Sequence, residues 1–271
     1  APSSVSTLAR HLPSRSRKGQ SSPTLMAQTG NMRGAWVMLE AVPQGSGFTE
    51  LADRLAARGA LGLLTPLYAN ADGYLIKRTM AASPVSLPVL SIRADLLPLL
   101  AGTCLQVRIP VVSRQPRGTN ILAHLPGTDE QLALAPLLIG AHYDAIGDDV
   151  SGLRDPGATD NAAAVAVLLE LARMLPHLPT SPQRPIILVA FDAEEVGAHG
   201  SHALARQFKE EGKEPLVLNL DGAACQNEAV WVEPGAHTES ILEALDQAGR
   251  WLALPLIVGN IASDHRQFVW T

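Results

Sequence analysis

The feature that most constrains the fold is an alternation of apolar strand patterns with helix patterns, which begins near residue 116. The runs at 136–141, 186–191 and 216–220 are apolar throughout, apart from Asn219 in the last, as strands buried on both faces of a sheet usually are. Between the first two runs, residues 162–175 repeat apolar side chains at helical spacing. The alternation predicts an α/β fold with a mostly parallel central sheet flanked by helices on both faces. Further strand patterns lie at 120–125, 230–232 and 256–258, and a further helix pattern at 238–252.

A smaller α/β region precedes this alternation. Residues 48–58 repeat apolar side chains at helical spacing, and Gly59 is placed to end that helix. The predicted apolar face comprises Phe48, Leu51, Ala52 and Leu55. Strand patterns lie around the helix at 35–41, 61–64, 89–92 and 105–112. With a Pro- and Gly-containing linker at 114–118, we expect a leader or edge segment over 1–30, a small domain over 31–115 and a larger domain over 116–271.

Composition excludes several functional classes. The 21 Lys and Arg against 26 Asp and Glu give a net charge of −5, without the concentrated positive face that a nucleic-acid binder needs. No apolar run reaches the roughly 18 residues of a membrane-spanning helix. The two cysteines, Cys104 and Cys225, are far apart in sequence, which disfavours a thiolate zinc site and a redox dithiol. We expect a globular protein that neither binds nucleic acid nor spans a membrane.

Polar side chains that can bind metal ions follow the predicted strands. They are His142 and Asp144 after the first run, Asp160 at the start of the helix 162–175, Glu194 and Glu195 after the run 186–191, Asp221 after 216–220, and His265 after 256–258. In an open α/β sheet, ligands bind at the carboxyl ends of the strands. Imidazoles and carboxylates at this edge provide the nitrogen and oxygen donors that suit zinc.

The charges favour two metal ions over one. Asp160, Glu195 and Asp221 carry three negative charges, and His142 and His265 bind metals as neutral ligands. Two divalent ions and one bound hydroxide would balance these charges, and a shared carboxylate would hold the ions about 3.5–4 Å apart. Without metal, the crowded carboxylates would repel one another and raise their pKa values. Taken singly, a histidine after a strand or a pair of glutamates is often structural; their joint placement favours a site.

These residues closely resemble the dinuclear zinc aminopeptidases of the bacterial leucyl aminopeptidase type, which have the zinc exopeptidase fold. The matching motifs are Ala-His-Tyr-Asp at 141–144, Asp-Pro-Gly-Ala-Thr-Asp-Asn at 155–161, Phe-Asp-Ala-Glu-Glu-Val-Gly at 191–197, Gly-Ser at 200–201, Asn-Leu-Asp at 219–221 and Ser-Asp-His at 263–265. The match runs in order through residues 119–268, and all five metal-ligand positions are present.

The resemblance implies a role for each residue. Asp160 would bridge two Zn²⁺ ions, with His142 and Asp221 completing one metal site, and Glu195 and His265 the other. Glu194 would be the general base. Asp144 would orient the imidazole of His142 without binding the metal itself. The implied reaction is hydrolysis of the N-terminal peptide bond of peptides with a free N-terminus, through a water bridged by the two ions.

Three further expectations come from the resemblance. Residues 31–112 are similar to a protease-associated domain, through the stretch 48–62 and Leu-Pro-Val-Leu-Ser-Ile at 87–92. The family commonly has an oxyanion-stabilising tyrosine between the positions of Asp221 and His265, and this chain has none there. The chain ends six residues after His265, where family members continue, so we expect a peptidase domain truncated at its C-terminus.

Two alternatives stay open beside the aminopeptidase. One is a related single-zinc glutaminyl cyclase, and the other is a catalytically silent binding protein of the same fold. Retention of His142, Asp221 and His265 together favours the dinuclear hydrolase. The family resemblance implies a secreted or periplasmic protein, although no leader is visible in the sequence. Side-chain preference and oligomeric state are left open.

Overall fold

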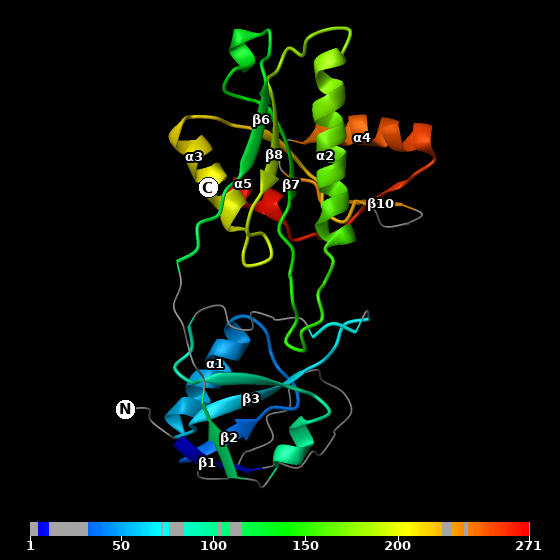
Figure 1. Ribbon diagram of the computed structural model, residues 1–271. Helices are drawn as coiled ribbons and strands as arrows, with labels where there is room; N and C mark the ends of the chain where they lie inside the picture. The colour runs from blue at the N-terminus through cyan, green and yellow to red at the C-terminus, as the bar shows by residue number, and fades with distance from the viewer. Residues whose placement is uncertain are drawn as a thin grey trace. The chain divides into compact units, whose positions relative to one another are not determined.

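The computed structural model describes residues 5–10, 32–71, 73–75, 84–101, 104–108, 115–223, 229–235 and 238–270, with backbone alone at 5–10, 104–107 and 270. The chain divides into two compact units, which are described separately (Figure 1). The N-terminal unit comprises Ala1–Arg114 and Asp148–Arg154, and the C-terminal unit comprises Gln115–Gly147 and Asp155–Thr271. Most of the predicted leader segment and Cys225 lie outside the described residues.

The N-terminal unit is built on a five-stranded sheet with the order β4-β3-β2-β1-β5. The strands are β1 (Val5–Arg10), β2 (Ala35–Met38), β3 (Gly62–Leu67), β4 (Val89–Arg93) and β5 (Cys104–Val107). All neighbouring pairs are parallel except β1 with β5. The predicted strand at 61–64 extends further, through Pro66 to Leu67, because β3 pairs with β4 up to Arg93.

Helix α1 (Ser46–Ala57) covers one face of this sheet. Its buried side chains are Phe48, Leu51, Ala52 and Leu55, as the sequence predicts. These side chains pack on Val37, Leu39 and Leu63 of the sheet region. Gly59 ends the helix with φ +82°, and the Ala60 N–H donates to the Leu55 carbonyl. A positive φ favours glycine at such helix ends, so the predicted cap is confirmed.

The C-terminal unit contains a four-stranded sheet with the order β6-β8-β7-β9. Its strands are β6 (Ile121–Leu125), β7 (Leu137–His142), β8 (Ile186–Phe191) and β9 (Leu216–Asn219). Strand β7 is parallel to β8 and β9, whereas β6 is antiparallel to β8 at the edge. The apolar runs of the sequence are thus strands of one mixed sheet, and the α/β class is confirmed.

Helices pack on both faces of this sheet (Figure 1). On one face, α2 (Ala163–Met174) buries Ala164 and Leu168 against Ile139 of β7. On the other face, α3 (His199–Glu210) and α5 (Gln267–Trp270) pack near Leu138 of β7. Successive strand residues point to opposite faces, so β7 contributes to both cores.

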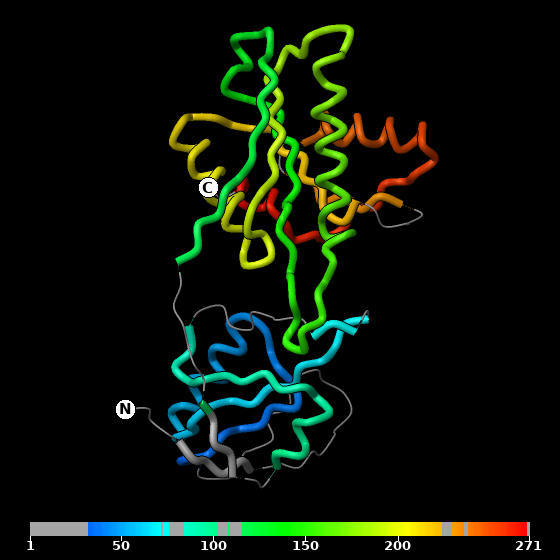
Figure 2. The backbone as a smooth tube through the Cα atoms, viewed as in Figure 1, coloured from blue at the N-terminus to red at the C-terminus, as the bar shows by residue number. Residues whose placement is uncertain are grey.

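A second, two-stranded sheet pairs β10 (Val230–Val232) with β11 (Leu256–Val258) in parallel. The tube in Figure 2 shows α4 (Glu239–Leu252) connecting these two strands. No helix among the described residues is long and apolar enough to cross a membrane.

Candidate metal centre

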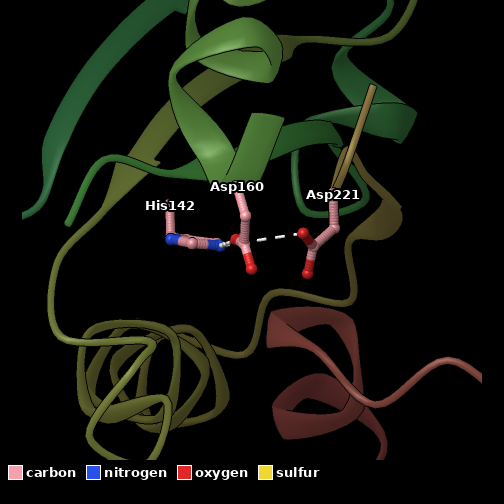
Figure 3. Close-up of side chains that lie close together, drawn as sticks. All are labelled: His142, Asp160 and Asp221. Carbon is pink, nitrogen blue, oxygen red and sulfur yellow. Dashed lines mark ion pairs between the residues drawn. The ribbon is translucent and has the colours of Figure 1, made fainter. Parts of the chain in front are cut away.

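Three of the predicted ligands form a cluster at the carboxyl edge of the four-stranded sheet (Figure 3). His142 is the last residue of β7 and is 1% exposed. Its Nε2 lies 3.0 Å from Asp160 Oδ1 and 3.7 Å from Asp221 Oδ1. One potential ligand atom from each of the three residues lies within 4.8 Å of the other two, and no other such group of three occurs among the described residues.

Backbone pairing and one buried amide hold this cluster together. Strand β7 pairs with β9, so His142 and Asp221 leave neighbouring strands at the same edge. Asn161, which follows Asp160, is 1% exposed. Its Nδ2 donates to the Leu220 carbonyl at 2.9 Å, and its Oδ1 accepts from the Gly222 N–H at 3.2 Å. Asn161 therefore links the Asp160 turn to the backbone on both sides of Asp221.

Glu194 and Glu195 lie in a tight turn after β8. Adjacent residues in an extended strand point in opposite directions, so both can face one site only from a turn. The Asp144 carboxylate accepts the backbone N–H of Glu194 at 3.0 Å and that of Glu195 at 3.1 Å. Asp144 also faces His142: its backbone carbonyl is 3.1 Å from His142 Nδ1, and its Oδ1 is 3.5 Å from the same nitrogen. Asp144 thus contacts both the glutamate turn and the imidazole.

The backbone leading into this turn passes close to Gly200, which leaves no room for a side chain at that position. A Cβ atom at this position would lie 2.3 Å from the Asp192 carbonyl oxygen and 2.4 Å from Asn120 Oδ1. The Asn120 side chain accepts the Asp192 N–H and donates to the Gly200 carbonyl. A side chain at residue 200 would therefore displace the backbone that leads into Glu194 and Glu195.

Glu195 and His265 stand outside the three-residue cluster. His265 lies in a short turn, Asp264–Arg266 (η5), and its Nε2 is 3.7 Å from Glu233 Oε2. The neighbouring Ser263 Oγ accepts from Asn219 Nδ2 at 2.9 Å, which ties this turn to β9. The structure therefore brings three predicted ligands together and leaves the other two beside them.

The charges around His142 are strongly coupled. Burial disfavours a charged imidazole, but the carboxylates of Asp160 and Asp221 outweigh it and raise the pKa of His142 to about 11. The same contact with His142 lowers the pKa of Asp221. In the absence of metal, the imidazole therefore carries a proton between the two carboxylates. A metal ion would take the place of that proton.

In the glutamate turn, burial favours the neutral form of the side chains, whereas His142 is held in its charged form. Burial, followed by the charges of neighbouring carboxylates, raises the pKa of Glu194 to about 7 and that of Glu195 to about 7. Burial likewise lowers the pKa of His265. The repulsion between crowded carboxylates that the sequence predicts is present, although desolvation by burial is the larger cause.

Two buried atoms beside the His142 cluster make this region suitable for metal ions. Glu195 Oε1 and His265 Nε2 are buried without a hydrogen-bond partner in the described part of the chain. Buried polar atoms normally find partners, and orphaned nitrogen and oxygen atoms at one edge are suited to a cation. The donor set and its geometry therefore fit zinc.

Two residues that shape this site, Asn161 and Glu233, are not among the site residues predicted from the sequence. Asn161 closes the matched motif at 155–161, and its position beside a ligand and ahead of a helix marks a constrained turn. Glu233 directly follows a short strand, as the predicted ligands do, and contacts both His265 and Arg266. The same strand-end criterion, applied to residues 230–232, would have selected it.

Comparison with known proteins places these observations in a family. The sequence matches peptidase family M28 over residues 120–270. A probable zinc metalloprotease of Pyrenophora tritici-repentis is 36% identical over 106 residues, covering 38% of this chain and 24% of that protein. Aminopeptidase YwaD of Bacillus subtilis is 30% identical over 155 residues, covering 49% of this chain and 31% of that protein. The chain thus spans less than a third of these two relatives.

The fold comparison agrees. The structure of a zinc aminopeptidase from Bacillus subtilis superposes with a TM-score of 0.62 at 22% identity, covering 89% of this chain and 58% of that one. At this identity the likeness concerns the fold. The family match covers more than half of the chain and includes every residue of the candidate metal centre. The chain belongs to peptidase family M28.

Proposed function

We propose that this chain is the metal-binding part of a zinc-dependent aminopeptidase of the dinuclear leucyl aminopeptidase type. The observation that carries the proposal is the cluster of His142, Asp160 and Asp221, with the Glu194–Glu195 turn beside it. Membership of family M28 and the names of two relatives, a probable zinc metalloprotease and an aminopeptidase, point to the same chemistry.

Five residues would hold two zinc ions. Asp160 would be shared, His142 and Asp221 would complete one site, and Glu195 and His265 the other. The unpartnered atoms of Glu195 and His265 support this set, as do the contacts of His142 with Asp160 and Asp221. When bound, zinc supplies Lewis acidity and lowers the pKa of a bound water.

Glu194 is the proposed general base. Its raised pKa, about 7, suits a group that must accept a proton and return it near neutral pH. It would take the proton of the attacking water and deliver it to the leaving amine. Asp144 would fix the position of Glu194 through the backbone N–H that it accepts and would also orient His142.

One observation favours a second candidate. The described residues contain a single compact ligand group, one imidazole with two carboxylates, which is the number of protein ligands that a single catalytic zinc uses. A single-zinc glutaminyl cyclase-like enzyme would need no more. It would release ammonia from an N-terminal glutamine without cleaving a peptide bond, and zinc stoichiometry together with product analysis separates the two reactions.

The rest of the chain carries further proposals. The N-terminal unit would be a protease-associated domain, and the protein would be secreted or periplasmic. The substrates would be peptides with a free N-terminus. These assignments rest on the sequence resemblance.

The test is a panel of aminoacyl chromogenic amides, each with a free amine and, as a matched control, N-acetylated. We expect chelator-sensitive and zinc-restored cleavage of the free-amine substrates alone, with about two zinc ions per chain. Equal cleavage of acetylated substrates would contradict the aminopeptidase. No bound zinc and no cleavage would favour the silent binding protein.

A further inference from the structure

Glu233, directly after β10, accepts hydrogen bonds with both oxygens of its half-buried carboxylate. Its Oε1 accepts from Arg266 Nη2 at 2.8 Å and from Arg266 Nε at 3.2 Å, and its Oε2 accepts from Arg266 Nη2 at 2.9 Å. Its Oε2 also accepts the backbone N–H of Ile261. Arg266 donates in addition to Asn260 Oδ1. Glu233 therefore binds both ends of residues 260–266, here called the His265 segment.

The same carboxylate lies beside the predicted ligand. Glu233 Oε2 is 3.7 Å from His265 Nε2, which is too long for a hydrogen bond. His265 Nε2 is buried and has no other partner among the described residues. Glu233 therefore acts on His265 through the backbone N–H of Ile261 and the side chain of Arg266, and it does not hydrogen-bond the imidazole itself.

The β10–β11 pairing explains why these groups meet. Val232 pairs with Val258, and the Gly259 N–H donates to the Val232 carbonyl at 3.0 Å. Glu233 and the His265 segment therefore leave the two-stranded sheet side by side. Among the described residues this sheet is separate from the four-stranded sheet that carries His142. Side-chain contacts of the His265 segment must set where His265 points.

We propose that Glu233, clamped by Arg266, is a positioning residue that holds His265 ready for the second metal ion. The inference rests on the proposed two-zinc function. Arg266 balances the charge of Glu233, so the clamp adds no net negative charge to a centre that already contains several carboxylates. The two-pronged guanidinium contact also fixes geometry, which a lysine could not do equally well.

The test uses the full chain with Glu233→Gln and a matched control, Glu170→Gln. Glu170 also accepts from Nε and Nη2 of one arginine, with Arg173 Nε at 2.9 Å, but each of its oxygens accepts from one nitrogen and the pair lies on the exposed surface of α2. Zinc affinity is measured by competition with a chelator, and bound zinc is counted by elemental analysis. We expect Glu233→Gln to keep one zinc ion and to bind the second more weakly, by about the 10–100-fold that loss of support around a metal ligand costs, because the His265 segment loses its clamp. Glu170→Gln should bind both as the wild type does.

Several outcomes would overturn the proposal. One is unchanged affinity for the second zinc ion in Glu233→Gln, and another is equal weakening of both ions in a folded variant. If Glu233→Gln does not fold, Arg266→Lys takes its place, since it keeps the charge but loses the two-pronged contact; normal affinity for the second ion would then contradict the proposal. Wild-type protein that binds a single zinc ion would instead show failure of the two-zinc function itself, and of this inference with it.

Discussion

The two halves of the candidate metal centre are built in different ways. His142, Asp160 and Asp221, the His142 half, come from the ends of paired strands and the turn before α2, and they already lie together. Glu195 and His265, the His265 half, come from a turn after β8 and a loop after β11. Ligands on paired strands are placed by the backbone ladder, whereas for the ligands on loops we propose side-chain clamps, namely Asp144 for Glu195 and Glu233 for His265.

The largest effect is expected at the residue that would serve both halves. Asp160→Asn should remove zinc from both sites, because the amide is a poor ligand for two ions at once. Loss of metal catalysis costs several kcal/mol, so activity should fall by on the order of 10³-fold or more. Elemental analysis and aminoacyl amide hydrolysis measure the two effects.

The matched control for this variant is Asp148→Asn. Asp148 lies between His142 and Asp160 in the sequence, but its side chain forms an exposed ion pair with Arg154. It should keep both zinc ions and full activity. Full zinc content in Asp160→Asn would show that the two halves share no ligand there.

A smaller effect separates chemistry from binding within the glutamate turn. Glu194→Gln keeps the size and polarity of the side chain but cannot accept a proton, so the rate should fall by about 10²–10⁴-fold. Zinc content should stay near that of the wild type. Glu195→Gln should instead lose metal from the His265 half. The reverse pattern would mean that the two roles are exchanged.

A third effect tests how the turn is held. Asp144→Asn leaves one oxygen to accept where the carboxylate offers two, so one of the N–H groups of Glu194 and Glu195 loses its partner. We expect zinc to bind 10–100-fold more weakly, as for other outer-shell changes. Asp129→Asn is the control, because Asp129 accepts a single backbone N–H on an exposed turn. Zinc affinity equal to the wild type in Asp144→Asn would contradict this role.

The difference between the halves also explains what the sequence could predict. Apolar runs mark the strands, and polar residues at their ends mark the edge of the sheet; the family match confirms that this stretch belongs to a peptidase family. The proximity of His142 and Asp221 follows from β7 pairing with β9. A strand pattern alone, however, does not reveal which strands are neighbours.

Contacts between distant loops were beyond the sequence. Nothing local indicates that Asp144 accepts N–H groups 50 and 51 residues away, or that Glu233 contacts Arg266 33 residues later. Such contacts depend on how turns meet in three dimensions. The domain boundaries and the roles of the five ligands stay predictions for the same reason.

The smallest expected effect is a difference between the two halves in how the stability of the metal-free protein depends on pH. Glu195 has a pKa of about 7 in the folded chain against a usual value of 4.5, so the folded state binds more protons than the unfolded state between about pH 4.5 and 7. The free energy of unfolding therefore falls as pH rises through that window. His142 has a pKa of about 11 against 6.5, so its stabilising charge is fully present below pH 6.5 and is lost toward pH 11.

As pH rises, loss of the proton from Glu195 and then from His142 lowers the free energy of unfolding, first below about pH 7 and then above about pH 6.5. We expect the melting temperature in the presence of chelator to fall by on the order of a few °C between pH 5 and pH 7. Glu195→Gln mimics the protonated carboxyl group and should reduce this fall only in part, because Glu194, whose pKa is also about 7, still titrates in the same window. The decline above pH 7 that arises from His142 should remain. Calorimetry at closely spaced pH values measures both. A melting temperature that rises from pH 5 to pH 7 would contradict proton binding by the glutamate turn, and an equal fall in Glu195→Gln would show that Glu195 takes no part in it.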